Sequence, residues 1–161
     1  MAAAGPSAEE IRRAVDLAYR ALGVRERTEV ELRGVLERRR VEPAAIEAAL
    51  EETRSAGYLD DARYALRFAE DRRALARWGA ERIERDLRRR GVADEHIEAA
   101  LGAQDGEEER AAALALLAER FPRELADDRE RDRAWRLLVR RGYDPELAYE
   151  AVREHRRRAL A

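Results

Sequence analysis

The sequence predicts an all-α protein, built as a tandem array of three three-helix repeats that forms an elongated, curved molecule. The first observation is that strong helix formers (Ala, Leu, Glu and Arg) dominate the 161 residues. The second is that 42% of the residues are charged and only 6% are aromatic, which suits small helical units sharing apolar faces better than one deep core. The third observation is an internal repeat.

Equivalent apolar positions recur at intervals of 51 residues (83 − 32 and 134 − 83). The segments 46–50 and 97–101 share the sequence Ile-Glu-Ala-Ala-Leu at this shift. One register held over three copies is not expected by chance, so we infer a repeat protein. The aligned positions are Leu32, Leu36, Val41, Ile46 and Leu50 in the first copy, Ile83, Leu87, Val92, Ile97 and Leu101 in the second, and Ala134, Leu138, Tyr143, Ala148 and Val152 in the third.

The predicted repeats span residues 8–56, 57–103 and 107–158, and the segment 102–106 is the best candidate for a hinge. Pro43 is predicted at the first position of a third helix, where its missing N–H does no harm.

Two capping boxes are predicted in the first copy. Ser7 with Glu10, and Thr28 with Glu31, have the spacing at which a hydroxyl and a carboxylate satisfy free amide groups of a first helical turn. These pairs predict helix starts just after residues 7 and 28.

The middle copy is predicted to open with Asp60 as an N-cap, and Gly79 is predicted to end or interrupt that first helix. Its second helix is predicted at about 80–90, followed by Gly91 as a left-handed cap. Tyr58 is predicted to join the packing of the helix corner. The apolar stripe predicted along the first helix is Ala62, Ala65, Leu66 and Ala69.

Charge is unevenly distributed, although the formal net charge is only −2. All 33 cationic residues are Arg. Residues 72–90 hold eight Arg against three acids, residues 91–130 hold four Arg against twelve acids, and residues 131–161 hold nine Arg against five acids. The two basic stretches are therefore the candidate binding surfaces.

The central motifs resemble those of the RecX family. The run from Gly57 to Ala65 is similar to the corner that opens the central repeat of that family. Gly79, Arg82, Ile83 and Leu87, followed by Arg90, Gly91 and Val92, are similar to its second-helix signature.

The resemblance implies a regulator of DNA repair, recombination and the SOS response rather than an enzyme. It implies binding to the RecA–single-stranded DNA filament and inhibition of ATP hydrolysis, strand exchange and coprotease activity. A monomer is expected, with single-stranded DNA within the filament as a further contact and with no cofactor. Capping of filament ends and internal disruption are both compatible with this role.

The candidate partner-binding residues come from the basic stretches and one aromatic position. The alternative is that these arginines lie on solvated helix faces beside Glu81, Glu84 and Asp86, or complement helix C-termini. Trp78 is either an exposed anchor or packs between helices, whereas Trp135 and Tyr143 are predicted in the core. The candidates are Arg72, Arg73, Arg77, Trp78, Arg82, Arg85, Arg88, Arg89, Arg90, Arg136, Arg140 and Arg141.

No catalytic or metal site is predicted. Cysteine is absent, His96 and His155 lie far apart in sequence, and no glycine-rich phosphate loop occurs. A helix start explains the paired carboxylates Asp60 and Asp61. No apolar run is long enough to span a membrane, and residues 1–6 do not resemble a secretory signal, so a cytoplasmic location is expected.

Two other functions remain open at this point. An autonomous DNA-binding helical module would show a steep dependence of affinity on salt, although the net charge and the acidic stretch disfavour it. A general helical-repeat adaptor would be distinguished by the partners that it captures.

Overall fold

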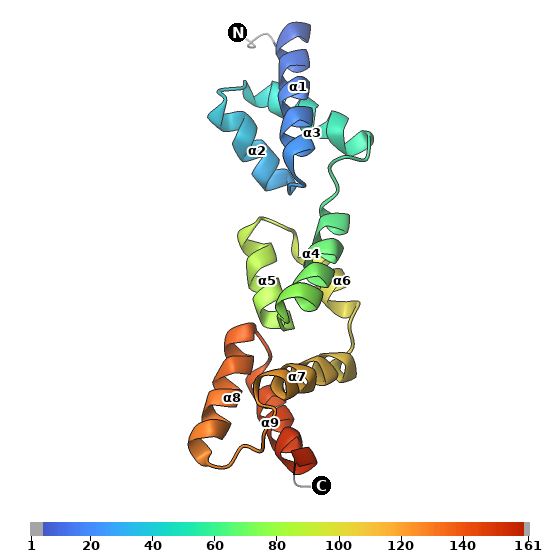
Figure 1. Ribbon diagram of the computed structural model, residues 1–161. Coiled ribbons are helices and arrows are strands. Elements are labelled where there is room, and N and C mark those ends of the chain that lie inside the picture. Colours follow the sequence, from blue (N-terminus) through green and yellow to red (C-terminus); the bar gives the residue numbers. More distant parts are fainter. Residues whose placement is uncertain (1–4, 160–161) are drawn as a thin grey trace. The chain divides into compact units, whose positions relative to one another are not determined.

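The computed structural model describes residues 5–159, and throughout this range every regular element is an α-helix, which confirms the all-α prediction (Figure 1). The expectation that residues 1–6 form no secretory signal falls mostly on residues outside the described range. The helices are α1 (Ala8–Val24), α2 (Glu29–Arg38), α3 (Pro43–Ser55), α4 (Asp61–Ala76), α5 (Ala80–Arg89), α6 (Asp94–Gly102), α7 (Gly106–Arg120), α8 (Asp128–Arg141) and α9 (Pro145–Ala159).

The helix starts follow the predicted repeat spacing. Helices α3, α6 and α9 begin at Pro43, Asp94 and Pro145, which are again 51 residues apart (94 − 43 and 145 − 94). The aligned apolar residues are buried in all three copies, except that Val41 and Leu101 are only half-buried. The repeat therefore reflects one pattern of core positions. The repeat boundaries and the hinge at 102–106, which joins α6 to α7, stay predictions.

Contacts divide the chain into two compact units, Met1–Ala65 with Leu87–Ile97, and Leu66–Asp86 with Glu98–Ala161. In the first unit, α1, α2 and α3 pack pairwise around a core of Leu32, Leu36, Ile46, Leu50 and small alanines. In the second unit, α9 packs on both α7 and α8. The core of the second unit contains Leu114, Leu116, Leu117, Leu125, Leu138, Tyr143 and Val152.

The predicted caps are present. Both capping boxes form, with Ser7 and Thr28 each accepting from the third amide of their helix. Pro43 is the first residue of α3, and Asp60 Oδ1 accepts from the backbone N–H of Arg63, 2.9 Å away. These caps explain why the helix starts were predictable from local sequence.

In the first unit, the C-terminal end of α5 meets the N-terminal end of α2. The Thr28 hydroxyl donates to the carbonyl oxygen of Arg90 at 2.6 Å. Gly91 has a φ of 80°, and a Cβ added to it would lie 2.5 Å from Cγ2 of Val30. Glycine is therefore required at position 91 for two reasons: its positive φ, and the close approach of the Val30 side chain.

The second unit contains a corresponding junction between the C-terminal end of α8 and the N-terminal end of α5. The amide of Gly79 donates to the carbonyl of Arg141 at 2.8 Å, and that of Glu81 donates to the carbonyl of Gly142 at 3.0 Å. A Cβ on Gly142, whose φ is 93°, would lie 2.3 Å from Cβ of Arg82. Carbonyl groups at one helix end thus satisfy free amide groups at the next.

Four local predictions were wrong or only partly right. Leu66 is exposed rather than part of the buried stripe. Tyr58 is 63% exposed, although its ring meets that of Tyr19 edge-on at a centroid distance of 5.4 Å. Trp135 is half-buried rather than fully inside, whereas Tyr143 is buried as predicted. Helix α4 ends at Ala76, before Gly79, because Arg77 adopts a left-handed φ of 55°.

Candidate partner-binding surface

The aromatic candidate, Trp78, lies between two of the predicted arginines. The guanidinium of Arg82 lies 4.0 Å from the centre of the indole ring and that of Arg72 lies 5.0 Å from it. Phe68 meets the same ring edge-on at a centroid distance of 6.3 Å. Trp78 is half-buried, so the packing interpretation fits it better than that of an exposed anchor.

Arg73 and Arg141 bind backbone carbonyls within the second unit. Arg73 donates to the carbonyls of Ala100 at 3.3 Å and Leu101 at 3.2 Å, near the C-terminal end of α6. Burial lowers the pKa of Arg73. Arg141 donates to the carbonyl of Ala76, where α4 ends. Both cations complement helix C-termini, as expected if these arginines stabilise the fold rather than bind a partner.

Arg90 joins the middle and first repeats within the first unit. One of its nitrogens lies 3.2 Å from Glu31 Oε1 and 3.1 Å from the hydroxyl of Tyr64. Burial raises the pKa of that Tyr64 hydroxyl. Arg88 pairs with Asp94 at 3.1 Å, but both side chains are exposed and the pair contributes little.

The remaining candidates are more open to solvent. Arg77 lies 3.9 Å from Glu119, and Arg136 pairs with Asp132 at 2.9 Å. Arg85, Arg89 and Arg140 have exposed side chains.

The structure brings together only part of the predicted basic surface. A side-chain nitrogen of Arg82 donates to the carbonyl of Arg140 at 3.3 Å, so the start of α5 and the end of α8 share one basic region. Arg88, Arg89 and Arg90 belong to the other unit. The twelve candidates therefore do not form one site inside either unit.

Asp60 and Asp61 have structural roles. Asp60 caps α4, and Asp61 Oδ1 accepts from the backbone N–H of Glu29 at 2.9 Å, at the start of α2. Burial raises the pKa of the Asp61 carboxyl. The helix-start interpretation of this acidic pair is confirmed by these contacts.

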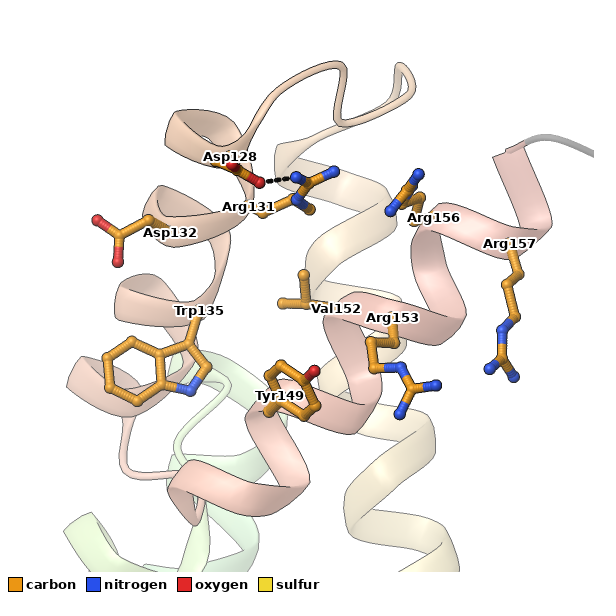
Figure 2. A pocket seen from close by; sticks show the side chains of 9 residues that line it. All are labelled: Asp128, Arg131, Asp132, Trp135, Tyr149, Val152, Arg153, Arg156 and Arg157. Atoms are coloured by element: carbon orange, nitrogen blue, oxygen red, sulfur yellow. Dashed lines mark ion pairs between the residues drawn. The ribbon is translucent and has the colours of Figure 1, made fainter.

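A groove between α8 and α9 was missed by the sequence analysis (Figure 2). It has a volume of about 830 Å³. Trp135 and Tyr149 lie at one end, and the indole N–H of Trp135 donates to the carbonyl of Pro145 at 3.0 Å. Assigning Trp135 to the core removed the signal that could have revealed this groove. Its lining consists of Asp128, Arg131, Asp132, Trp135, Tyr149, Val152, Arg153, Arg156 and Arg157.

Comparison with known proteins identifies the family of the chain. Family models described as the first and second three-helix domains of RecX match residues 14–52 and 60–101. A protein from Deinococcus radiodurans named Regulatory protein RecX is 42% identical over 154 residues, covering 92% of this chain and 72% of the relative. The chain belongs to the RecX family. A RecX relative from Mycobacterium avium is 36% identical over 150 residues, covering 91% of this chain and 86% of its own length.

Solved RecX structures share this fold. The crystal structure of RecX from Lactobacillus salivarius matches with a TM-score of 0.82 at 18% identity, covering 92% of this chain and 98% of the other. A second crystal structure of a regulatory protein RecX matches with a TM-score of 0.76 at 21% identity, covering 91% and 73%. Within residues 5–159, no helix is long and apolar enough to cross a membrane.

Proposed function

We propose that this RecX-family chain binds the filament that RecA forms on single-stranded DNA and inhibits its ATP hydrolysis, strand exchange and coprotease activity. The observation that carries the proposal is the 42% identity, over 92% of the chain, to a protein named Regulatory protein RecX. On this proposal the chain is a regulator of DNA repair and recombination that acts in the cytoplasm, as a monomer and without catalysis of its own.

The exposed arginines of the second unit are the proposed filament contacts. Arg85 on α5 and Arg140 on α8 have exposed side chains, and the hydrogen bond from Arg82 to the carbonyl of Arg140 joins the two helices. Guanidinium groups suit both acidic protein surfaces and DNA phosphates, because their donors pair with two oxygens at once. In contrast, Arg73, Arg90 and Arg141 are expected to act mainly through folding, since they bind groups within the protein.

The proposal is tested by surface plasmon resonance on an immobilised single-stranded oligonucleotide, bare or coated with RecA from the same organism. We expect affinity for the coated strand to exceed that for the bare strand by at least about tenfold. Equal or tighter binding to bare DNA would instead favour the autonomous DNA-binding module. Absence of binding to both surfaces would contradict the proposal.

A charge reversal locates the contact. The double variant Arg85→Glu/Arg140→Glu is expected to weaken filament binding by about tenfold. The matched control, Arg12→Glu/Arg13→Glu, reverses two exposed charges on α1 and is expected to leave binding unchanged. Circular dichroism verifies that each variant retains its helical content. An equal effect of both pairs would disprove the assignment of the site.

A further inference from the structure

The groove between α8 and α9 combines an aromatic end with a cationic end. Tyr149 is 57% exposed, and the guanidinium of Arg153 lies 5.7 Å from the centre of its ring. Figure 2 shows Trp135 and Tyr149 together near the start of α9, and Arg156 and Arg157 further along it. Tyr149 and Arg156 are about 10 Å apart along the helix axis, from a rise of about 1.5 Å per residue.

The net charge of the groove comes from α9. Both acids on the α8 side have ion-pair partners on their own helix, Asp128 with Arg131 and Asp132 with Arg136. Within the described part of the chain, Arg156 and Arg157 have no such partner. The α8 wall is thus locally neutral, whereas the α9 wall offers guanidinium groups to an anion.

The corresponding positions in the first repeat carry a different combination of side chains. At the 51-residue spacing, Trp135 and Tyr149 correspond to Arg33 and Glu47 in the first repeat. Those two side chains form an ion pair that joins α2 to α3. The fold therefore accommodates an ordinary polar pair at these positions, and the aromatic rings are not required by the repeat architecture.

The first repeat keeps only one cation of this wall. Arg153 and Arg157 correspond to Glu51 and Ser55 there, whereas Arg156 corresponds to Arg54, which is paired with Glu29 and Glu51. The favourable placement of cations at a helix C-terminus accounts for arginines late in α9, but it does not account for Tyr149 earlier on α9 or for Trp135 on α8. A single ligand with a flat ring and a negative charge accounts for both.

We propose that this groove binds a nucleotide, with its base stacked at Trp135 and Tyr149 and its phosphates at Arg153, Arg156 and Arg157. Aromatic faces beside arginines are the usual combination for unpaired bases, because every base has a stacking face and every nucleotide carries a phosphate. The volume of about 830 Å³ is sufficient for a nucleoside triphosphate. The same chemistry could come from a free nucleotide or from one unit of a single strand.

An acidic peptide is the competing occupant. It would use the guanidinium groups equally well, but it does not require flat rings. The open ring of Tyr149 and the fixed orientation of the Trp135 indole therefore favour a nucleotide.

Binding is measured by fluorescence anisotropy on the full chain with two probes, an ATP analogue that carries a fluorescent group on its ribose and a fluorescein-labelled oligothymidylate. Saturable binding of the ATP analogue with weak binding of the oligonucleotide identifies a free nucleotide as the ligand. The opposite order identifies a strand, and affinity should then fall with salt, with a slope of about −0.7 per phosphate contacted. Either result supports the proposal.

Two variants test the two ends of the groove separately. Trp135→Arg/Tyr149→Glu installs the side chains of the first repeat and is expected to weaken binding at least about tenfold through loss of stacking. Arg156→Ala/Arg157→Ala is expected to weaken it by a similar factor. The matched control, Arg129→Ala/Arg133→Ala, removes two exposed charges of α8 outside the groove and should have less than a twofold effect.

Three results would overturn the proposal. The first is no binding of either probe at millimolar protein, and the second is the same loss in the control as in the groove variants. The third is competition by inorganic tripolyphosphate or a polyglutamate peptide as effective as that by ATP, because neither competitor has a base to stack.

Discussion

The first and third repeats have the same skeleton but present different surfaces. Their third helices begin 102 residues apart (145 − 43), at Pro43 and Pro145, which is two repeat lengths of 51. The equivalent core residues Leu36 and Leu138 are both fully buried. Between the second and third helices, however, the first repeat has the Arg33–Glu47 ion pair, whereas the third has a groove with Trp135 and Tyr149. Core positions are thus constrained by the repeat, while the surface positions beside them are free to differ.

The end of the second helix gives a related contrast. Arg40, Gly91 and Gly142 occupy equivalent positions, and all three have positive φ values of 57°, 80° and 93°. Gly91 and Gly142 lie against the preceding repeat, where a Cβ would overlap its neighbours. Arg40, which follows α2 in the first repeat, carries a side chain in the same left-handed backbone region. Glycine is therefore needed where a positive φ coincides with close packing against another repeat. A side chain is tolerated where the positive φ is the only constraint.

The largest expected effect distinguishes the two junctions. Gly142→Ala is expected to destabilise the protein by about 4 kcal/mol, since the strained φ adds to overlap with the backbone of Arg82. Gly91→Ala is expected to cost about 2 kcal/mol, because its Cβ meets only the partly exposed side chain of Val30. Urea unfolding measures both values.

Gly23→Ala is the control for these variants, because Gly23 lies in α1 with open space around it. This change should stabilise the protein by about 0.5–1 kcal/mol through helix propensity. Equal costs at Gly91 and Gly142 would show that backbone conformation alone decides the effect.

Removing the strain in the first repeat should have the opposite sign. Arg40→Gly is expected to stabilise the protein by about 1 kcal/mol, because glycine adopts the left-handed conformation without a steric penalty. Arg39→Gly is a suitable comparison, since its φ of −87° gives glycine no such advantage. If both changes destabilise the protein, the strain at Arg40 is not an energetic cost.

The smallest expected effect concerns two carboxylates that bind the start of a second helix. Asp61 accepts from the amide of Glu29, and Glu109 accepts from that of the equivalent residue, Ala80. Burial raises the pKa of Asp61. Its charged form is therefore disfavoured in the folded state, and stability is lost as pH rises from the unfolded carboxyl's pKa through the folded one.

Asp61→Asn keeps an oxygen acceptor and removes the buried charge. Relative to the unchanged protein, it should be more stable by about 0.5 kcal/mol at neutral pH, and this difference should vanish as pH falls below the unfolded carboxyl's pKa. Urea unfolding at several pH values measures the difference. A difference that grows towards acid pH would show that the charged carboxylate is the stabilising form.

The sequence predicted the helices well because their signals are local. Capping pairs such as Thr28 with Glu31 and apolar pairs such as Leu32 with Leu36 act within one or two helical turns. The candidate site was harder to predict, since its residues form contacts across long sequence separations. Neither the bond from Arg90 to Glu31 nor that from Arg73 to the end of α6 can be seen in a local pattern. The half-buried Trp135 was assigned to the core for the same reason.

The proposed regulation of a RecA filament is tested by the rate of RecA ATP hydrolysis on single-stranded DNA, titrated with this protein at fixed salt. We expect inhibition at ratios well below one chain per RecA, because a filament regulator acts on growth or disassembly rather than on each subunit. Inhibition only when the protein saturates the DNA, or no inhibition at all, would contradict it.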